Sequence, residues 1–384
     1  MKILHTISGF GNRSGGTSTC TYDLLRNINS NEIYADILTP DTKDKNDKLM
    51  GHGEDWIKIV NNDCISPYAY SKETKRFIEN SNYDVYHTNG LWLHCNHITC
   101  SIARKKNKPY IITPHGMLYP AALKRSYWKK WPLLKMQFEK DIREATCIHA
   151  TCKPELEHIR NFGYKGPIAL IGNPADLPPY IDDLSGRKAE TQIITFGFLG
   201  RLHPRKKVEN LLYGVAGCPP ENKKRMHLVI MGKGDDSYEQ FLRNETKRLK
   251  LEENVEFKGF VKGREKFELL SELSALFVPS DFENFGMIVT EALAAGTPVF
   301  ASLGTPWEIL NEAKCGWWRE RDPKNISEVM TTIANMSTEE INEMGKRGKE
   351  LVYKHFTGDR IASQMLTLYN WIINGGEKPD FIYY

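Results

Sequence analysis

The sequence predicts a doubly wound α/β fold with two Rossmann-like domains, and three observations support this fold class. Short apolar runs alternate with helical patterns along the 384 residues, as in α/β proteins with a parallel sheet. Most of the runs are continuous in Ile, Val, Leu and Phe, as in strands that are buried on both faces. The runs form two series separated by residues 172–190, whose Pro, Gly and Asp content is typical of a linker.

The individual elements follow from these runs in chain order. The first series predicts strands at residues 1–7, 36–40, 84–90, 109–116, 147–151 and 168–174. The second series predicts strands at residues 192–200, 226–234, 255–261, 275–280 and 298–302. Helical patterns in the second series lie at residues 205–217, 237–250, 264–273 and 286–295. Ligands of doubly wound sheets bind at the carboxyl ends of the strands, so we expect two domains that face each other across one deep cleft.

Composition and charge exclude several functional classes. The chain is 40% hydrophobic and 26% charged, which is typical of a soluble globular protein. A net charge of +4 is too small to indicate nucleic-acid binding. The short apolar stretch at the start is typical of a first strand, because a signal peptide needs a longer apolar core. The eight scattered cysteines include no CxxC pair and resemble reduced thiols, so we expect a cytoplasmic protein.

One cysteine-containing stretch, "HCNHITC", contains side chains of the types that commonly bind metals in other proteins. These side chains are His94, Cys95, His97 and Cys100. Their spacing matches no common zinc pattern, and no second half-site follows. We therefore predict no metal site there.

The segment 101–140 is strongly biased, with ten Lys or Arg residues and a single acid, Glu139. Within residues 120–140 the basic residues alternate with apolar ones, namely Leu123, Tyr127, Trp128, Trp131, Leu134 and Phe138. Such a pattern fits a helix lying on an anionic membrane surface. It fits equally a solvated basic helix whose aromatic side chains point inward. The segment is also a candidate to line a site for a lipid-linked, phosphate-bearing substrate.

The loop "SGFGNRSGGTSTC" follows the first predicted strand and precedes a helix that starts near Thr17. Its glycines do not form GxGxxG, which argues against a dinucleotide cofactor. Gly15 and Gly16 nevertheless leave bare backbone amides at a positive helix end, where phosphate oxygens can bind. A tight turn without a ligand explains the same residues.

The stretch "GFLGRLHPRKK" follows the first strand of the second series. Arg201 and Lys206 lie beyond its carboxyl end, where both can converge on a diphosphate. A Walker motif is absent from the sequence, which excludes a P-loop. A solvated basic loop is the alternative interpretation.

The stretch "FENFGMIVTEALAAGTP" holds two glutamates eight residues apart. Glu283 precedes a predicted helix, and Glu291 lies in its second turn. Glu283 can accept hydrogen bonds from sugar hydroxyls and Glu291 from a ribose diol. Helix capping by Glu283 is the alternative, but it does not explain Glu291. The amides at the positive helix end belong to Asn284, Phe285, Gly286 and Met287.

Together these motifs resemble the retaining GT-B glycosyltransferases of family GT4. The resemblance rests on the glutamate pair Glu283 and Glu291, on "GRLHPRK" and on the loop of Gly15 and Gly16. It covers nearly the whole chain, since further motifs occur in the family's order: "TNGLWLH", "TPHGML", "LIGNP", "GFLGRL", "GKGD", "FKGFV" and "EALAAGTPVFAS".

The resemblance implies an activity and a domain plan. The expected reaction moves a hexose from a UDP- or GDP-linked sugar to a saccharide or lipid-linked saccharide, in surface polysaccharide or lipopolysaccharide O-antigen synthesis. Residues 1–172 would form the acceptor-side domain and residues 173–365 the donor domain, with residues 366–384 crossing back onto the first. The family transfers with retention through a front-side reaction and uses neither a cofactor nor, in the absence of a DxD motif, a metal ion.

The resemblance also assigns roles to single residues. It implies that Arg201 and Lys206 hold the diphosphate, that Glu291 binds the ribose and that Glu283 binds the transferred sugar. It places His115 beside the donor sugar at the reaction centre. The backbone at Phe260 and Val261 would meet the base, and the amides of Gly15 and Gly16 would face the diphosphate. Lys207 departs from the family, in which a Gly often follows the Lys.

Two other functions compete with this one. A nucleotide-sugar 2-epimerase of the same fold would turn over free UDP-sugar without an acceptor, and no positive sequence feature favours it. A membrane-docked binding protein that has lost catalysis is the second alternative. The intact set of Arg201, Lys206, Glu283 and Glu291 argues against it.

Overall fold

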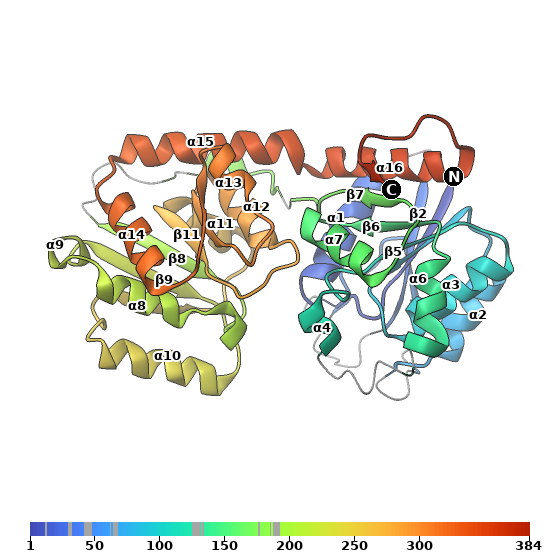
Figure 1. Cartoon of the computed structure of the whole chain (residues 1–384), viewed down its shortest axis with the longest axis horizontal. Coiled ribbons are helices and arrows are strands. Elements are labelled where there is room, and N and C mark those ends of the chain that lie inside the picture. The colour runs from blue at the N-terminus through green and yellow to red at the C-terminus, as the bar shows by residue number, and fades with distance from the viewer. Residues whose placement is uncertain are drawn as a thin grey trace. The chain divides into compact units, whose positions relative to one another are not determined.

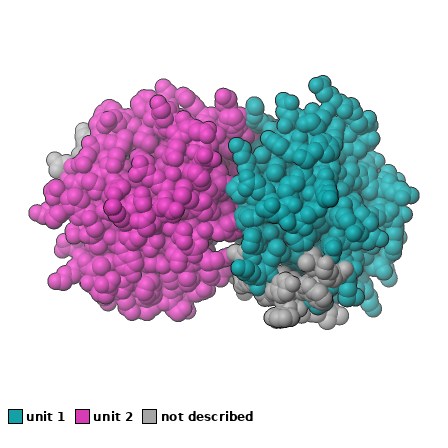
Figure 2. Space-filling model, viewed as in Figure 1, with its two compact units in different colours: residues 1–174, 358–384 teal, residues 175–357 magenta. Residues whose placement is uncertain are grey.

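The computed structural model describes residues 1–11, 14–29, 33–41, 48–61, 63, 68–124, 132, 134–175, 177–184, 186 and 193–384. The chain divides into two compact units (Figure 2). Unit 1 comprises Met1–Pro174 and Gly358–Tyr384, and unit 2 comprises Ala175–Thr357.

Unit 1 contains, over its described residues, an eight-stranded sheet in the order β14-β7-β6-β5-β4-β1-β2-β3. Its pairings are parallel except that β14 is antiparallel to β7. The strands are β1 (Lys2–Thr6), β2 (Tyr34–Pro40), β3 (Ile57–Val60), β4 (Val85–Asn89), β5 (Tyr110–Thr113), β6 (Cys147–Ala150), β7 (Ile168–Leu170) and β14 (Ile382–Tyr383).

Helices cover both faces of this sheet, because successive apolar strand residues point to opposite faces. One core joins Ile3 and Ile111 to α1 and α16, which pack together (Figure 1). The other core joins Leu4 and Ile112 to α2, α3, α6 and α7. The helices are α1 (Gly16–Ile28), α2 (Lys72–Asn80), α3 (His94–Lys105), α4 (Pro120–Lys124), a π-helix (Leu134–Phe138), α6 (Glu139–Arg143), α7 (Lys153–Phe162) and α16 (Gly358–Asn374).

Unit 2 contains a parallel sheet in the order β10-β9-β8-β11-β12-β13. Its strands are β8 (Ile194–Leu199), β9 (Met226–Met231), β10 (Val255–Gly259), β11 (Ala275–Val278), β12 (Val299–Ser302) and β13 (Gly316–Arg319). One face packs on α8, α10 and α14, and the other on α11, α12 and α15 (Figure 1). The α-helices are α8 (Glu209–Gly217), α9 (Pro220–Lys223), α10 (Asp236–Arg248), α11 (Gly263–Glu272), α12 (Met287–Ala294), α13 (Ile309–Glu312), α14 (Pro323–Ala334) and α15 (Thr338–His355).

The predicted fold class is confirmed, since each unit is a doubly wound α/β sheet. Every predicted strand is present with slightly different ends, whereas β3, β13 and β14 were not predicted. The division of the chain after Pro174 lies two residues from the predicted boundary. The returning segment starts at Gly358 rather than at residue 366, because α16 is one helix whose Ile361 and Ala362 already pack in the core of unit 1. Among the described helices, none combines the length and apolar character that crossing a bilayer requires.

Candidate functional site

The site in unit 2 is built on two neighbouring strands, β8 and β11. They pair in parallel, with Leu276 opposite Gly197, so their carboxyl ends meet at one edge of the sheet. The loop after β8 carries Lys206 in a short 3₁₀ helix, Pro204–Lys206, and the loop after β11 carries Glu283. Backbone hydrogen bonding joins the loops, since the amide of Asp281 donates to the carbonyl of Arg205 at 2.7 Å. Sheet order therefore brings together residues 77 positions apart.

Lys206 and Glu283 form an ion pair, in which Nζ of the lysine contacts Oε1 of the glutamate. The hydroxyl of Ser280 donates to the same Oε1 at 2.7 Å, and the backbone amide of Glu283 donates to the carbonyl of Gly304 at 3.1 Å. The lysine side chain is 27% exposed and the glutamate side chain 15%. The N-cap residue of α12 is Gly286, and the described contacts of the Glu283 carboxylate are with Lys206 and Ser280. Ser280 was not predicted.

The turn before α12 is fixed by Gly286 and by Trp307. Gly286 has φ 83° and ψ 65°, a left-handed conformation that favours glycine. The indole Nε1 of Trp307 donates to the carbonyl of Phe285 at 2.5 Å, and the Phe285 ring packs edge-on against the indole. Phe285 is therefore a core side chain, and only its backbone remains for a ligand. Asn284 and Met287 are half-buried on either side of the turn.

Glu291 also has a cationic partner. Its Oε1 lies 3.0 Å from Nζ of Lys266 in α11, and the two side chains are 13% and 17% exposed. The pair holds the carboxylate in the second turn of α12. Lys266 was not predicted, because its pairing with Glu291 depends on how α11 packs against α12.

Arg201 and Lys207 behave differently from Lys206. The Arg201 side chain is 72% exposed, and its Nη2 lies 3.5 Å from Asp235 Oδ1, so the structure does not bring it to the partner of Lys206. Lys207 lies 3.8 Å from carboxylate oxygens of both Glu209 and Asp281. Its φ of 52° and ψ of 39° are left-handed, which explains physically why a glycine suits this position.

Phe260 and Val261 follow the carboxyl end of β10. The Phe260 side chain is 67% exposed, whereas Val261 is buried in the core that includes α11 and α12. Gly259 and Gly263, with φ 79° and 58°, bracket this stretch and set its path. The structure therefore leaves an aromatic ring exposed beside a strand end.

In unit 1, Gly15 and Gly16 lie at the amino end of α1. Gly15 is the N-cap residue, with φ 88° and ψ −171°, a region that is essentially restricted to glycine. Gly15 has no side chain to cap this helix end, and both glycines are exposed. The first backbone amides of a helix lack partners within the helix, which is why such an end suits an anion.

His115 lies in the loop after β5 with φ 50°. Its Nε2 is 3.3 Å from Oδ1 of Asn89, and the residue is half-buried. Burial, with a smaller contribution from His149, lowers the pKa of His115 to about 3. The imidazole is therefore neutral near pH 7.

Comparisons with known families agree with this arrangement. Residues 14–178 match the family described as Glycosyltransferase Family 4, and residues 185–351 match Glycosyl transferases group 1. The chain belongs to the GT4-type glycosyltransferases of the GT-B fold. The family membership that the sequence motifs predict is confirmed.

Individual relatives are distant. An uncharacterized glycosyltransferase of Methanocaldococcus jannaschii is 30% identical over 179 residues, which is 45% of this chain and 43% of that protein. The chain thus spans less than half the length of that relative. HepE of Anabaena in complex with UDP and glucose has a TM-score of 0.72 at 16% identity, covering 96% of this chain and 99% of that one. WaaG, a glycosyltransferase involved in lipopolysaccharide biosynthesis, has a TM-score of 0.71 at 13% identity, covering 97% and 100%.

The cysteine-containing stretch of the glycosyltransferase has a structural role. His97 Nδ1 lies 2.7 Å from Asp141 Oδ2, and His94 Nδ1 accepts from the amide of Ser71 at 3.3 Å. Cys95 and Cys100 are buried in α3. Over the described part of the chain, no cluster of three or more His, Cys, Asp or Glu side chains suits a metal ion.

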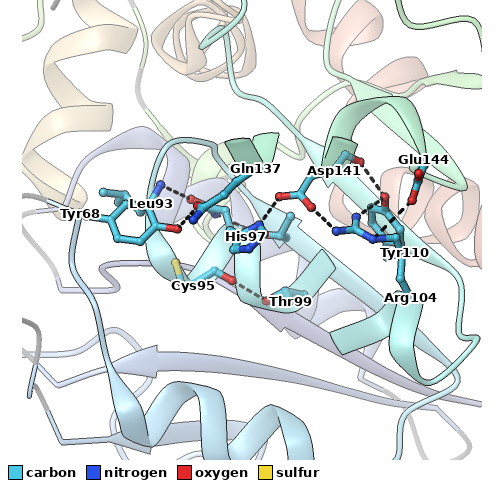
Figure 3. Close-up of polar contacts among 12 residues, drawn as sticks. Tyr68, Leu93, Cys95, His97, Thr99, Arg104, Tyr110, Gln137, Asp141 and Glu144 are labelled. Carbon is cyan, nitrogen blue, oxygen red and sulfur yellow. Dashed lines mark hydrogen bonds and ion pairs between the residues drawn. The ribbon is translucent and has the colours of Figure 1, made fainter. Parts of the chain in front are cut away.

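The helix α6, at the end of the basic segment, is held against α3 by a polar cluster around Asp141 (Figure 3). Arg104 Nη2 lies 2.6 Å from Asp141 Oδ1, and the Tyr68 hydroxyl donates to Gln137 at 2.5 Å. Phe138 is buried against Trp92, so at this residue the side chain points inward, as the alternative interpretation expects. Tyr127, Trp128 and Trp131 lie outside the described residues, as does the side chain of Leu134.

Proposed function

We propose that this glycosyltransferase transfers a hexose, with retention of the anomeric configuration, from a nucleotide diphosphate sugar to a saccharide or lipid-linked saccharide. The observation that carries the proposal is the pair of Lys206 and Glu283 at the carboxyl ends of β8 and β11. In this pair, the Lys206 ammonium can bind a phosphate group, and the neighbouring Glu283 carboxylate can accept hydrogen bonds from sugar hydroxyls. A nucleotide diphosphate sugar presents both of these groups.

Different residues of unit 2 contact different parts of the donor. Lys206 meets the diphosphate as a point charge, and Arg201 meets it as a two-pronged donor. Arg201 is available because its exposed contact with Asp235 is 3.5 Å long and contributes little stability. Glu283, oriented by Ser280, accepts bonds from hydroxyls of the transferred sugar.

The nucleoside is held further along the same sheet edge. Glu291, fixed by Lys266, accepts hydrogen bonds from the ribose diol. The backbone at Phe260 and Val261 meets the base. In unit 1, the proposed contacts are the amides of Gly15 and Gly16 for the diphosphate and His115 for the transferred sugar.

The proposed reaction occurs on one face of the sugar. The bond between the anomeric carbon and the diphosphate oxygen breaks, and the acceptor hydroxyl forms a bond to the same face. Its proton passes to the leaving diphosphate oxygen. Arg201 and Lys206 stabilise the charge that develops there, so we propose a reaction that needs no metal ion.

The likeness to HepE, which was crystallised with UDP and glucose, supports a UDP-linked hexose, and a GDP-linked hexose is the second candidate. The likeness to WaaG supports a role in lipopolysaccharide biosynthesis. The proposal extends to other surface polysaccharides, including O-antigen, made at the cytoplasmic face of the membrane. For residues 120–140 we propose contact with an anionic membrane surface or with the phosphate of a lipid-linked acceptor. Co-sedimentation with anionic vesicles, set against competition by a phosphate-bearing acceptor, separates the two.

The test measures nucleotide release from a panel of UDP- and GDP-hexoses with saccharide acceptors. Lys206→Ala and Glu283→Gln should each lower kcat/KM about 100-fold, as expected when one preorganised charge is lost from the reaction centre. Glu268→Gln is the control, because it removes an exposed ion pair with Arg264 elsewhere in unit 2.

Three results would contradict the proposal. Equal rates for the wild type and both site variants would remove the assigned roles. Turnover of a UDP-sugar without any acceptor would indicate an epimerase. An absence of nucleotide affinity in calorimetry would favour a catalytically inactive binding protein.

A further inference from the structure

A chain of hydrogen bonds crosses the sheet of unit 1 and ends at His115. From the carbonyl of Ile171 it runs through one side chain after another to the loop after β5. The distances between successive polar atoms are 2.8, 2.9, 2.7, 2.9, 2.8, 3.2 and 3.3 Å. In order, the side chains are His149, Thr113, His87, Tyr369, His5, Asn89 and His115.

The order of the strands in the sheet explains how residues so far apart in sequence form one continuous series of hydrogen bonds. His149 lies in β6, Thr113 in β5, His87 in β4 and His5 in β1, which are consecutive strands of the sheet. His5 is directly opposite His87 in the register. Tyr369 reaches these strands from α16, the helix that packs with α1 on this face.

The side chains in this series of hydrogen bonds are buried, and burial determines the protonation state of the histidines among them. His5, His87 and His149 are at most 4% exposed. Burial lowers the pKa of His5 to about 3 and that of His149 to about 4, and it holds the pKa of His87 well below its ordinary value. Each imidazole therefore carries one proton near pH 7, on one of its two nitrogens.

The carbonyl at one end decides where each proton lies. Ile171 O can only accept, so His149 donates from Nε2 and leaves Nδ1 to accept from the Thr113 hydroxyl. Thr113 then accepts from His87 Nε2, and His87 Nδ1 accepts from Tyr369.

The same rule carries the assignment to His115. Since the single Tyr369 proton is directed at His87, its oxygen accepts from His5 Nε2. His5 Nδ1 then accepts from the Asn89 amide nitrogen, which turns Asn89 Oδ1 toward His115. The carbonyl of Thr6 also accepts from Asn89 Nδ2 in this orientation, but at 3.4 Å the contact is longer than the one to His5.

We infer that this relay fixes His115 as the tautomer with a proton on Nε2 and a bare Nδ1, and that Tyr369 and Thr113 are positioning residues for it. In this state Nδ1 can only accept a hydrogen bond, so it suits a ligand O–H or N–H group and not a phosphate oxygen. The tautomer itself is independent of the proposed function. Its effect on catalysis rests on the proposed placement of His115 at the transferred sugar.

Long-range ¹H–¹⁵N NMR of ¹⁵N-histidine protein, without ligand, tests the tautomers directly. We expect His5, His87, His115 and His149 to be neutral and protonated on Nε2 at pH 7. Tyr369→Phe removes the bridging hydroxyl, and Thr113→Val removes the next one along. In both variants we expect His115 to become a mixture of tautomers. Detection of His115 protonated on Nδ1, or charged, in the wild type would overturn the inference.

Measurements of kcat for sugar transfer test the catalytic consequence of the His115 tautomer. Tyr369→Phe should lower kcat for transfer about tenfold, the value of one lost hydrogen bond, with little change in KM for the donor. Tyr353→Phe is the matched control, since that exposed hydroxyl bonds Asp182 in unit 2. An unchanged His115 tautomer together with an unchanged kcat in Tyr369→Phe would also overturn the inference. If no donor sugar is turned over at all, the NMR result still decides the relay, while the proposed function fails.

Discussion

At the scale of single residues, the two glycines at the start of α1 differ in what the fold requires of them. Gly15 has a backbone conformation that only glycine adopts readily. Gly16 is the first residue of the helix, and a Cβ added there would meet no atom within 4 Å. The described part of the fold therefore needs glycine at 15 but not at 16, where the proposed close approach of the donor would give glycine a role.

Gly16→Ala separates folding from binding. The free energy of unfolding should stay equal or rise by up to about 1 kcal/mol, because alanine favours a helix. The KM for the donor should rise about tenfold, since the methyl group displaces the diphosphate from the amides. Urea denaturation and donor titration measure the two effects. Gly15→Ala should instead destabilise unit 1, and an unchanged KM in Gly16→Ala would exclude these amides from the donor site.

The glutamates show what residue spacing can and cannot predict. The sequence places Glu283 before a helix and Glu291 within it, and the structure agrees. Their partners were not predictable, because Lys206 meets Glu283 only through the neighbouring positions of β8 and β11. Lys266 reaches Glu291 only through the packing of two helices. The local sequence predicts where each carboxylate lies relative to the helix, whereas the order of strands and the packing of helices determine which lysine pairs with it.

At the scale of elements, α6 is fastened to α3 through a buried carboxylate. Asp141 is fully buried, and it bonds both His97 and Arg104 (Figure 3). The Tyr110 hydroxyl also donates to its carbonyl at 2.7 Å. Because a buried charge is costly without partners, the cluster determines where the segment that follows the basic stretch rests on α3.

Asp141→Ala should lower the free energy of unfolding by about 3 kcal/mol, because it leaves the Arg104 guanidinium without its closest carboxylate. Glu79→Gln, which removes an exposed ion pair with Lys75, should cost less than about 1 kcal/mol. Urea denaturation of both variants gives the comparison. Similar losses for the two would show that the buried cluster does not anchor the segment.

The strands that the sequence did not reveal are short or lie at sheet edges. β3 places only Ile57 and Val60 inward, and β14 has two residues. β13, with the sequence "GWWR", is an edge strand whose tryptophans are only half-buried. Long continuous apolar runs were recognised because they are buried on both faces, a condition that edge strands do not meet. The histidines inside β1, β4 and β6 were visible in the sequence, but their alignment required the strand order.

At the scale of the whole molecule, the relay makes unit 1 sensitive to acid. His5 and His149 have pKa values of about 3 and about 4 in the fold, against about 6.5 in an unfolded chain. Between these values the unfolded state binds more protons than the folded state. Stability therefore rises with pH, is fully present above about pH 6.5 and is lost progressively as the pH falls toward 4.

The free energy of unfolding of unit 1 should accordingly fall between pH 6.5 and pH 5 by about 1.4 kcal/mol per pH unit for each buried histidine that remains neutral. Hydrogen exchange of the β4, β5 and β6 amides, corrected for intrinsic rates, reports this quantity for the sheet itself. His149→Gln removes one titrating group, so its slope against pH should be smaller by one proton while carboxylate contributions stay the same. Equal slopes in the wild type and the variant would mean that His149 is not held neutral. A smaller slope would tie the acid sensitivity of the sheet to the same buried hydrogen bonds that orient His115.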